Sequence, residues 1–407
     1  MFLLDRRSFI STVLATRTLR GESLPPVRPI TKGPKFHWFG YYDKLQFDPS
    51  SRYVLGMEGT IEHRLPTAND FVRLGMVDTQ DGDRWIELAE GHAWSWHQGC
   101  MLQWLAGSST DVIFNDRVED RFVSHILNVR TGKRRTLPMP IYCISPDGRH
   151  GIVNDFSRSF AMRPETGYAG LEDPFSNQLA PEESGIWKMD LRTGKSDLIL
   201  SLADVVDLPR EGGYSKNAKH YFDHLLFAPD GQRFVFFQRW RGEAEGRAFS
   251  TRMLSANADG SNIRVLDPYG RTSHYNWRDS RSLLVWMNHP SHGERFYMMN
   301  EPDASVEPFA PDAMPKNGHP SFFRGSRWVV SDTSPDQDRL QHSYVYDTKT
   351  RKRYDIGHFH SPPEYTGYWR CDTTPRVSPD GKKIVVDSPH GRNGRQMYLI
   401  DISSIVG

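Results

Sequence analysis

The chain has 407 residues, a formal net charge of +1 at pH 7 and 37% hydrophobic residues. This length is enough for a large buried core, and the balanced charge excludes the basic excess that nucleic acid or an anionic membrane surface would require of a main binding partner. Three cysteines are too few for a disulfide scaffold, and the sequence has no apolar run of the roughly 18 residues that predict a membrane-spanning helix.

Residues 1–24 predict either an export signal or a disordered basic tail. The pair Arg6-Arg7 precedes a short apolar stretch, Phe9 to Ala15, which resembles a twin-arginine signal and would direct the protein to the periplasm or out of the cell. Basic residues follow the stretch closely, so a cytoplasmic protein with a frayed tail is the alternative. In either case these residues lie outside the fold.

A hairpin motif recurs seven times along the chain. Its clearest copies are the Ser/Ala-Pro-Asp-Gly sequences at 145–148, 228–231 and 378–381, each followed by a run rich in β-branched or aromatic residues. Proline fixes φ and Asp-Gly closes a tight turn, so each copy predicts a hairpin between two strands. Degenerate copies fill the gaps at residues 48–51, 106–109, 278–281 and 324–327.

A second motif, a strand that ends in a polar turn, follows each hairpin. Its copies are residues 76–79, 127–132, 189–194, 255–260, 298–300, 346–348 and 399–401. Two turns per unit without a helical period predict a four-stranded antiparallel blade, and seven units predict an all-β, seven-bladed β-propeller. Because such blades close in a ring, we expect one domain over residues 25–407, with the loop 160–183 capping one face.

The segments just before the hairpins are expected to line the central channel. His224, His274 and His319 occur at nearly the same offset on neighbouring blades, and Cys371 or Asp372 on the next blade could reach the same point. Imidazole and thiolate are good ligands for transition metals. The pattern therefore predicts a divalent metal ion, zinc or manganese rather than calcium, whose role could be structural. The alternative is a set of channel histidines that bind water.

His97, Tyr142 and Arg158, on blades two and three, are the candidate catalytic residues. Arg158 would neutralise a substrate carboxylate and acidify the proton on the adjacent carbon. Tyr142 or His97 would take that proton, and the other would protonate the leaving oxygen. A tyrosine base requires a cation to depress its pKa of about 10. Each residue also has a structural interpretation: Tyr142 as a core aromatic, Arg158 in a surface ion pair and His97 as a hydrogen-bonding residue.

Five further residues are candidate substrate contacts. Trp94 and Trp96 flank His97 and could form a wall that stacks on sugar rings, while the aromatic segment 37–42 is either a substrate platform or blade packing. The predicted substrate-binding residues are Trp94, Trp96, Tyr41, Tyr221 and Arg239.

The repeats and the site residues together resemble known propellers. The runs 375–384 and 395–399 look like TolB-type repeats, and residues from about 35 to 402 resemble the seven-bladed polysaccharide lyases, namely the oligogalacturonate lyases and the propeller-type ulvan lyases. The order His97, Tyr142, Arg158 is similar to the catalytic His, Tyr and Arg of the ulvan lyases, which cleave at uronic acid by β-elimination. The resemblance also implies a metal site with His and Cys ligands, whose matching positions here are His224, His274, His319 and Cys371.

One departure from this family concerns a further catalytic histidine. The ulvan lyases supply it from the blade before His97, whereas Val77 stands near the matching place in this chain, and His63 or His92 would need a loop to deliver it. A different uronate-containing polysaccharide is therefore the expected substrate.

Two classes of function follow from these observations. The first is a lyase for an acidic polysaccharide or oligosaccharide, acting as a monomer because a closed propeller need not oligomerise. The second is a non-catalytic propeller that binds a glycan or a protein. A glycoside hydrolase would need two positioned carboxylates, and the spacing singles out no such pair. A serine peptidase would need a Gly-x-Ser-x-Gly elbow in a separate α/β domain.

Overall fold

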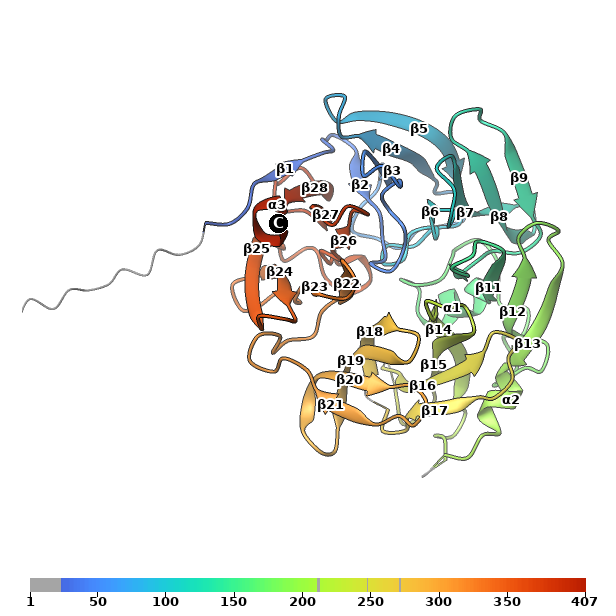
Figure 1. Cartoon of the computed structure of the whole chain (residues 1–407). Coiled ribbons are helices and arrows are strands. Elements are labelled where there is room, and N and C mark those ends of the chain that lie inside the picture. Colours follow the sequence, from blue (N-terminus) through green and yellow to red (C-terminus); the bar gives the residue numbers. More distant parts are fainter. Residues whose placement is uncertain (1–22, 211–212, 247, 271) are drawn as a thin grey trace, which may run out of the picture.

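Seven four-stranded antiparallel sheets, arranged as blades around a central axis, make up the fold (Figure 1). The computed structural model describes residues 23–407 except 211, 212, 247 and 271, and this count refers to those residues. The predicted seven-bladed β-propeller is confirmed. The expected export signal lies in residues 1–22, outside the described part of the chain.

The blades follow one another along the chain. From the axis outwards, blade one consists of β2(Phe36–Trp38), β3(Tyr53–Gly59), β4(Val72–Asp78) and β5(Arg84–Gly91), and blade two of β6(Gln103–Trp104), β7(Asp111–Val118), β8(Arg121–Asn128) and β9(Arg134–Leu137). Blade three consists of β10(Cys143–Ile144), β11(His150–Asn154), β12(Gly185–Asp190) and β13(Ser196–Ser201). Blade four consists of β14(Lys219–Phe227), β15(Arg233–Arg241), β16(Ser250–Asn257) and β17(Arg264–Asp267). Blades five to seven consist of β18(Thr272–Asp279), β19(Ser282–His289), β20(Gly293–Asn300) and β21(Val306–Pro308); β22(Ser321–Phe323), β23(Trp328–Ser331), β24(Leu340–Asp347) and β25(Lys352–His360); β26(Arg376–Val377), β27(Lys383–Ser388), β28(Gln396–Asp401) and β1(Val27–Pro29).

The ring closes between its two ends. Strand β1 pairs antiparallel with β28, with Val27 opposite Ile400, so the start of the chain supplies the outermost strand of the last blade. This closure holds the first and last blades together through backbone hydrogen bonds and removes two open sheet edges.

The predicted hairpins lie where the sequence placed them. The turn 145–148 joins β10 to β11, and Gly148 adopts φ of +69°, a left-handed conformation that favours glycine. Its closing bond runs from the Gly148 N–H to the Ser145 carbonyl, at 2.8 Å. The equivalent turns at 228–231 and 378–381 join the first two strands of blades four and seven.

Four short helical segments interrupt the strands: α1(Phe156–Met162), α2(Leu202–Val206), η1(Gly367–Trp369) and α3(Ser403–Val406). Strand β11 ends at Asn154, and α1, which carries Arg158, follows it. Asp155 caps the helix, since its carboxylate accepts the Arg158 N–H at 3.0 Å. Within the described residues, no helix is both long enough and apolar enough to cross a membrane.

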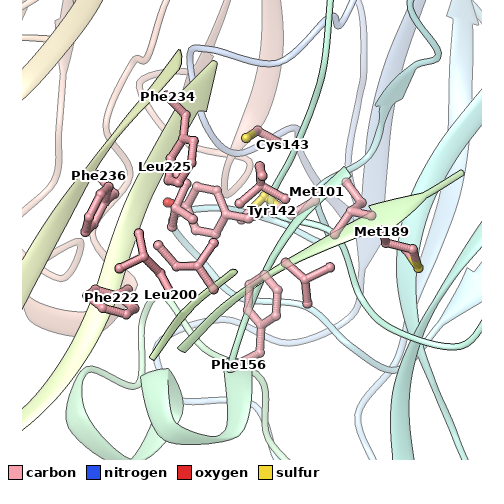
Figure 2. Packing of buried hydrophobic residues seen from close by; sticks show 14 of the residues in the cluster. Met101, Tyr142, Cys143, Phe156, Met189, Leu200, Phe222, Leu225, Phe234 and Phe236 are labelled. Carbon is pink, nitrogen blue, oxygen red and sulfur yellow. The ribbon is translucent and has the colours of Figure 1, made fainter. Parts of the chain in front are cut away.

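The hydrophobic core lies between neighbouring blades. Figure 2 shows part of the largest cluster, in which Tyr142 and Phe156 pack among side chains of blades two to four. The Tyr142 side chain is 1% exposed, and its ring stacks on Phe156 with centroids 6.0 Å apart. This packing places the tyrosine ring in the core and leaves only its hydroxyl for polar contacts.

Candidate functional site

A cavity of about 290 Å³ lies on the axis, and every blade contributes residues to its wall. Most of these residues stand in the innermost strands or in the segments that enter them. Trp96 and His97 precede β6, Asn317 and His319 precede β22, and Arg370 precedes β26. The sequence predicted that these segments face the channel, and for these residues the prediction is confirmed.

Two glycines allow the segments of blades one and two to meet. Gly40 has φ of +114°, and a Cβ there would lie 2.8 Å from the Gln98 backbone. Gly99 has φ of +61°, and its Cβ would lie 2.7 Å from the Phe39 carbonyl oxygen. Only glycine fits such close backbone approaches, so these positions fix Tyr41 and His97 on adjacent parts of the cavity wall.

Buried polar atoms without a protein partner gather in this wall. Within the described residues, they include Trp38 Nε1, His97 Nε2, Gln98 Oε1 and Arg239 Nε. An unsatisfied buried donor or acceptor costs about 1–3 kcal/mol, and each such group in a folded protein requires an explanation. A polar ligand in the cavity would supply the missing partners.

Four arginines line the cavity, namely Arg163, Arg239, Arg370 and Arg395, the last of which binds Glu62 at 2.9 Å. Arg163 and Arg239 share the buried carboxylate of Asp223, and Arg370 donates to Asp372 at 2.8 Å. Burial opposes ionisation of Asp223, but the two arginines outweigh it and hold the pKa of this carboxyl below its usual value. Asp223 lies behind Arg163 and Arg239, whereas Asp372 lines the cavity beside Arg370, and the guanidinium donors that these acids leave free suit an anionic ligand such as a carboxylate.

His97 has the protonation state that a general base requires. Burial, together with the charges of Arg370 and Arg163, lowers its pKa well below the ordinary value of 6.5. The imidazole is therefore neutral at pH 7, and its Nε2 has no protein partner within the described residues. A neutral ring with a free nitrogen in a cavity can accept a proton from a bound ligand.

Tyr142 is connected to the cavity only through other residues and does not line it. Its hydroxyl accepts the Gln98 side-chain amide at 2.8 Å and the His224 N–H at 2.9 Å, and it donates to Asp223 at 3.2 Å. Burial and the Asp223 charge raise the pKa of Tyr142 well above its ordinary value. Both effects oppose the action of this tyrosine as a base.

Arg158 also lies away from the cavity. It sits on α1 with no exposed surface, and its guanidinium binds Asp173 at 3.0 Å. The remaining donors bind the carbonyls of His220, Phe175, Gln178 and Leu179, at 2.5–3.2 Å. The structure therefore brings His97 to the cavity without Tyr142 or Arg158.

The predicted substrate contacts divide into two groups. Tyr41, Trp96 and Arg239 line the cavity. Trp94 packs behind Trp96, with ring centroids 5.0 Å apart, and Tyr221 is buried with burial raising its pKa to about 12. Trp94 and Tyr221 thus support the wall rather than form it.

The predicted metal ligands are only partly brought together. His274 and His319 pair with ring centroids 4.2 Å apart, and their Nδ1 atoms are held by Asn317 at 3.0 Å and Asp332 at 2.9 Å. His224 stacks on Tyr275 instead, with ring centroids 4.1 Å apart.

The other two predicted ligands do not complete a metal site. Both ring nitrogens of His224 lie 3.3 Å from tyrosine hydroxyls, and burial raises the pKa of the Cys371 thiol, which disfavours the thiolate that a metal binds. In the described part of the chain no three His, Cys, Asp or Glu side chains are grouped closely enough to hold a metal ion. The residues present thus do not fit the predicted four-ligand site.

Metal content provides a test of this finding. We expect the purified protein, after dialysis against a chelator and then against trace manganese or zinc, to retain well under one equivalent of metal by elemental analysis. Its melting temperature should be the same with and without the chelator. A stoichiometric ion that His274→Ala removes would contradict this expectation.

The sequence prediction missed the most cationic part of the wall. Arg163 lies in the loop 160–183, which was expected to cap a face and does bring Arg163 and Thr166 to the cavity. Arg370 directly precedes the predicted ligand Cys371, but as a single basic residue it carried no pattern. Phe249 lies against both Arg163 and Arg239, with guanidinium-to-ring distances of 5.1 and 4.7 Å.

Comparisons with known proteins support the fold. No family model matches the chain, and no curated protein sequence matches it significantly. Among solved structures, an oligogalacturonate lyase in complex with manganese matches with a TM-score of 0.65 and 15% identity over 93% of both chains. The oligogalacturonate lyase from Vibrio parahaemolyticus matches with a TM-score of 0.63 and 13% identity over 92% of this chain and 93% of that one. TolB from Acinetobacter baumannii matches with a TM-score of 0.41 and 14% identity over 75% of this chain and 64% of that one.

At these identities the likeness concerns the fold. The expected resemblance to oligogalacturonate lyases is confirmed at that level. The resemblance to ulvan lyases stays a prediction.

Proposed function

We propose that the protein is a polysaccharide lyase that cleaves a uronic-acid-containing polysaccharide or oligosaccharide by β-elimination. The observation that carries the proposal is the axial cavity, in which two arginines joined by Asp223 face the same space as a neutral His97 with an unpartnered Nε2. The fold shared with two oligogalacturonate lyases is consistent with it.

The proposed reaction uses the side chains that line the cavity. Arg163 and Arg239 bind the uronate carboxylate and neutralise it, which acidifies the proton on C5. His97 Nε2 takes this proton, and the electron pair forms a double bond between C4 and C5 as the bond from C4 to the glycosidic oxygen breaks. The released oxygen needs a proton, and the Tyr41 hydroxyl supplies it.

Tyr41 is suited to the role of the acid. Burial and the charge of Asp223 raise its pKa, so the hydroxyl keeps its proton at neutral pH. His224 Nδ1 lies 3.3 Å from this hydroxyl and helps to orient it. This assignment retains the predicted combination of arginine, histidine and tyrosine but transfers the arginine and tyrosine roles to other residues.

No step of this mechanism passes through a metal ion, because the donor set does not fit one. His274 and His319, on blades five and six, instead provide polar contacts on the side of the cavity away from blade two, which carries His97. Export to the periplasm or beyond, as the Arg6-Arg7 pair predicts, forms part of the proposal, since polymeric uronates occur outside the cytoplasm.

A non-catalytic glycan-binding propeller is the second candidate. It is favoured by one finding, that Tyr142 and Arg158 do not join His97 in the cavity. It predicts saturable binding of an acidic glycan without any change in that glycan.

Ultraviolet absorbance separates the two functions. The protein would be incubated with ulvan, polygalacturonate, glycosaminoglycans and a rhamnogalacturonan. β-Elimination creates a double bond conjugated with the carboxylate, so we expect a steady rise with one of these polymers. Binding to a polymer with no rise on any of them would reject the lyase and support the binding module.

A further inference from the structure

Asp223 is the most heavily hydrogen-bonded acidic side chain next to the cavity. Its Oδ1 accepts the His224 N–H at 2.8 Å, the Gln98 amide at 3.2 Å and the Tyr142 hydroxyl at 3.2 Å. Its Oδ2 accepts Arg163 at 3.1 Å and also Arg239. The side chain is buried and does not itself line the cavity, so it acts on a ligand only through these partners.

The backbone is shaped to place this carboxylate. The pairing of β14 with β15 shifts register between Asp223 and Leu226, which marks a β-bulge, and His224 adopts φ of +51°. Bulges redirect side chains, and a non-glycine residue at positive φ is a strained conformation that surrounding contacts must maintain. The irregularity turns Asp223 toward blades two and three, where Gln98, Tyr142 and Arg163 lie.

Arg163 and Arg239 need the negative charge of Asp223 in order to lie close together. Arg163 and Arg239 are largely buried, with 15% and 7% of their side chains exposed, and both point at the same oxygen of Asp223. Without the carboxylate, two nearby guanidinium groups would repel each other in a poorly solvated wall. Arg163 binds Glu165 through Nε at 2.8 Å while its Nη1 binds Asp223, so without the Asp223 charge Glu165 would hold Arg163 on its own loop rather than beside Arg239.

We propose that Asp223 is a positioning residue that holds Arg163 and Arg239 as one carboxylate-binding pair, and that Tyr142 serves the reaction indirectly, through Asp223 and Gln98. This inference rests on the proposed function and adds the element that sets its acid recognition. The carboxylate couples blades two, three and four through single hydrogen bonds, and its partners Gln98 and Tyr142 on blades two and three keep Oδ2 directed at the arginines.

The test measures the selectivity for an acid over its ester. The probe is an oligosaccharide of the polymer that gives the largest absorbance rise, or the galacturonate trimer if none does, prepared as the acid and as the methyl ester. The wild-type protein should bind the acid about 10- to 100-fold more tightly than the ester, by titration calorimetry. Asp223→Asn should reduce this ratio to less than about threefold while leaving affinity for the ester unchanged.

A matched control separates positioning from general stability. Glu301 is a buried carboxylate that also binds two arginines, Arg233 and Arg264, both at 2.7 Å, but away from the cavity. Glu301→Gln should lower the melting temperature while leaving the acid-to-ester ratio at the wild-type value. If the role of Asp223 were purely structural, Asp223→Asn would behave like Glu301→Gln: it would lower the melting temperature and leave the acid-to-ester ratio at the wild-type value.

Two further variants complete the test. In an Arg163→Gln/Arg239→Gln background, adding Asp223→Asn should change the ratio no further, because the pathway through the arginines is already broken. If Asp223→Asn does not fold, Asp223→Glu retains the charge and displaces it, and it should give an intermediate ratio.

The outcomes distinguish this inference from the proposed function. Wild-type protein without any preference for the acid would reject the proposed function and this inference with it. A wild-type preference that persists in Asp223→Asn, or in Asp223→Glu if only that variant folds, would reject the inference alone. Tyr142→Phe provides a second readout. A loss of kcat of no more than about fivefold supports the indirect role of Tyr142. A loss of a hundredfold or more would identify Tyr142 as the base and reject its indirect role.

Discussion

Replacing His97 by alanine is expected to lower kcat about a thousandfold while changing KM by less than about threefold. The imidazole Nε2 is buried in the cavity wall without a protein partner, so its removal takes away the base and leaves the arginines that bind the carboxylate in place. The measurement is the initial rate of absorbance increase on the polymer found active, across substrate concentrations. Equal loss in kcat and affinity would instead indicate that His97 binds substrate.

The pH dependence provides an independent check on the same residue. The lowered pKa of His97 means that it stays neutral as the pH falls through the ordinary value of 6.5. The rate should therefore persist below pH 6.5 and fall only when the imidazole takes up a proton at lower pH. An acid limb centred near 6.5 would place the base at a solvent-exposed histidine, and His92→Ala is a suitable control because His92 is partly exposed outside the cavity.

The fold could be predicted because turn chemistry is local. Pro-Asp-Gly sequences close three of the hairpins by themselves, and together with the four degenerate copies they allow few topologies other than a closed ring. The pairing of β1 with β28 was not predicted, because it joins Val27 to Ile400 at the far end of the chain and a three-residue strand such as β1 has no pattern of its own.

The cavity was predicted less completely because the direction of a side chain depends on local irregularities. Tyr41, Trp96 and His97 were identified because the segments before the hairpins do face the axis, whereas Arg239 reaches the cavity from β15, the strand after the hairpin. Tyr142 lies next to the two-residue strand β10, where alternation cannot indicate which way a side chain points. The bulge in β14 that places Asp223 and His224 likewise leaves no signature in the sequence.

The predicted metal ligands do not come together, and the reason is again a local irregularity of the backbone. It assumed that equal offsets before each hairpin place residues at one depth. The offset holds for His274 and His319, whose rings meet, but the bulge turns His224 toward Tyr275. A single irregular strand was thus enough to separate the set.

Arg158 lies on the helix α1 rather than on a strand, and there it is held by structural contacts. A strand reaching Arg158 would have left its side chain near the blade edge, whereas the Asp155 cap starts a helix that buries it. A buried guanidinium must then satisfy its donors within the protein, and it does so with one carboxylate and four carbonyls. In this position Arg158 does not face the cavity that His97 lines.

Replacing Arg158 by alanine is expected to destabilise the protein by about 3–5 kcal/mol, because it strands the buried Asp173 carboxylate and four carbonyl oxygens. Lys219, whose Nζ lies 3.0 Å from Asp173, offsets part of the loss. The measurement is urea unfolding, with Arg149→Ala as the control, since the Arg149 side chain is 80% exposed and its removal should change the free energy of unfolding by less than about 0.5 kcal/mol.

Below the unfolding transition, Arg158→Ala should keep kcat within about twofold of wild type. A catalytic Arg158 would show the reverse, near-normal stability with kcat reduced a thousandfold, and that result would restore the role predicted from the sequence.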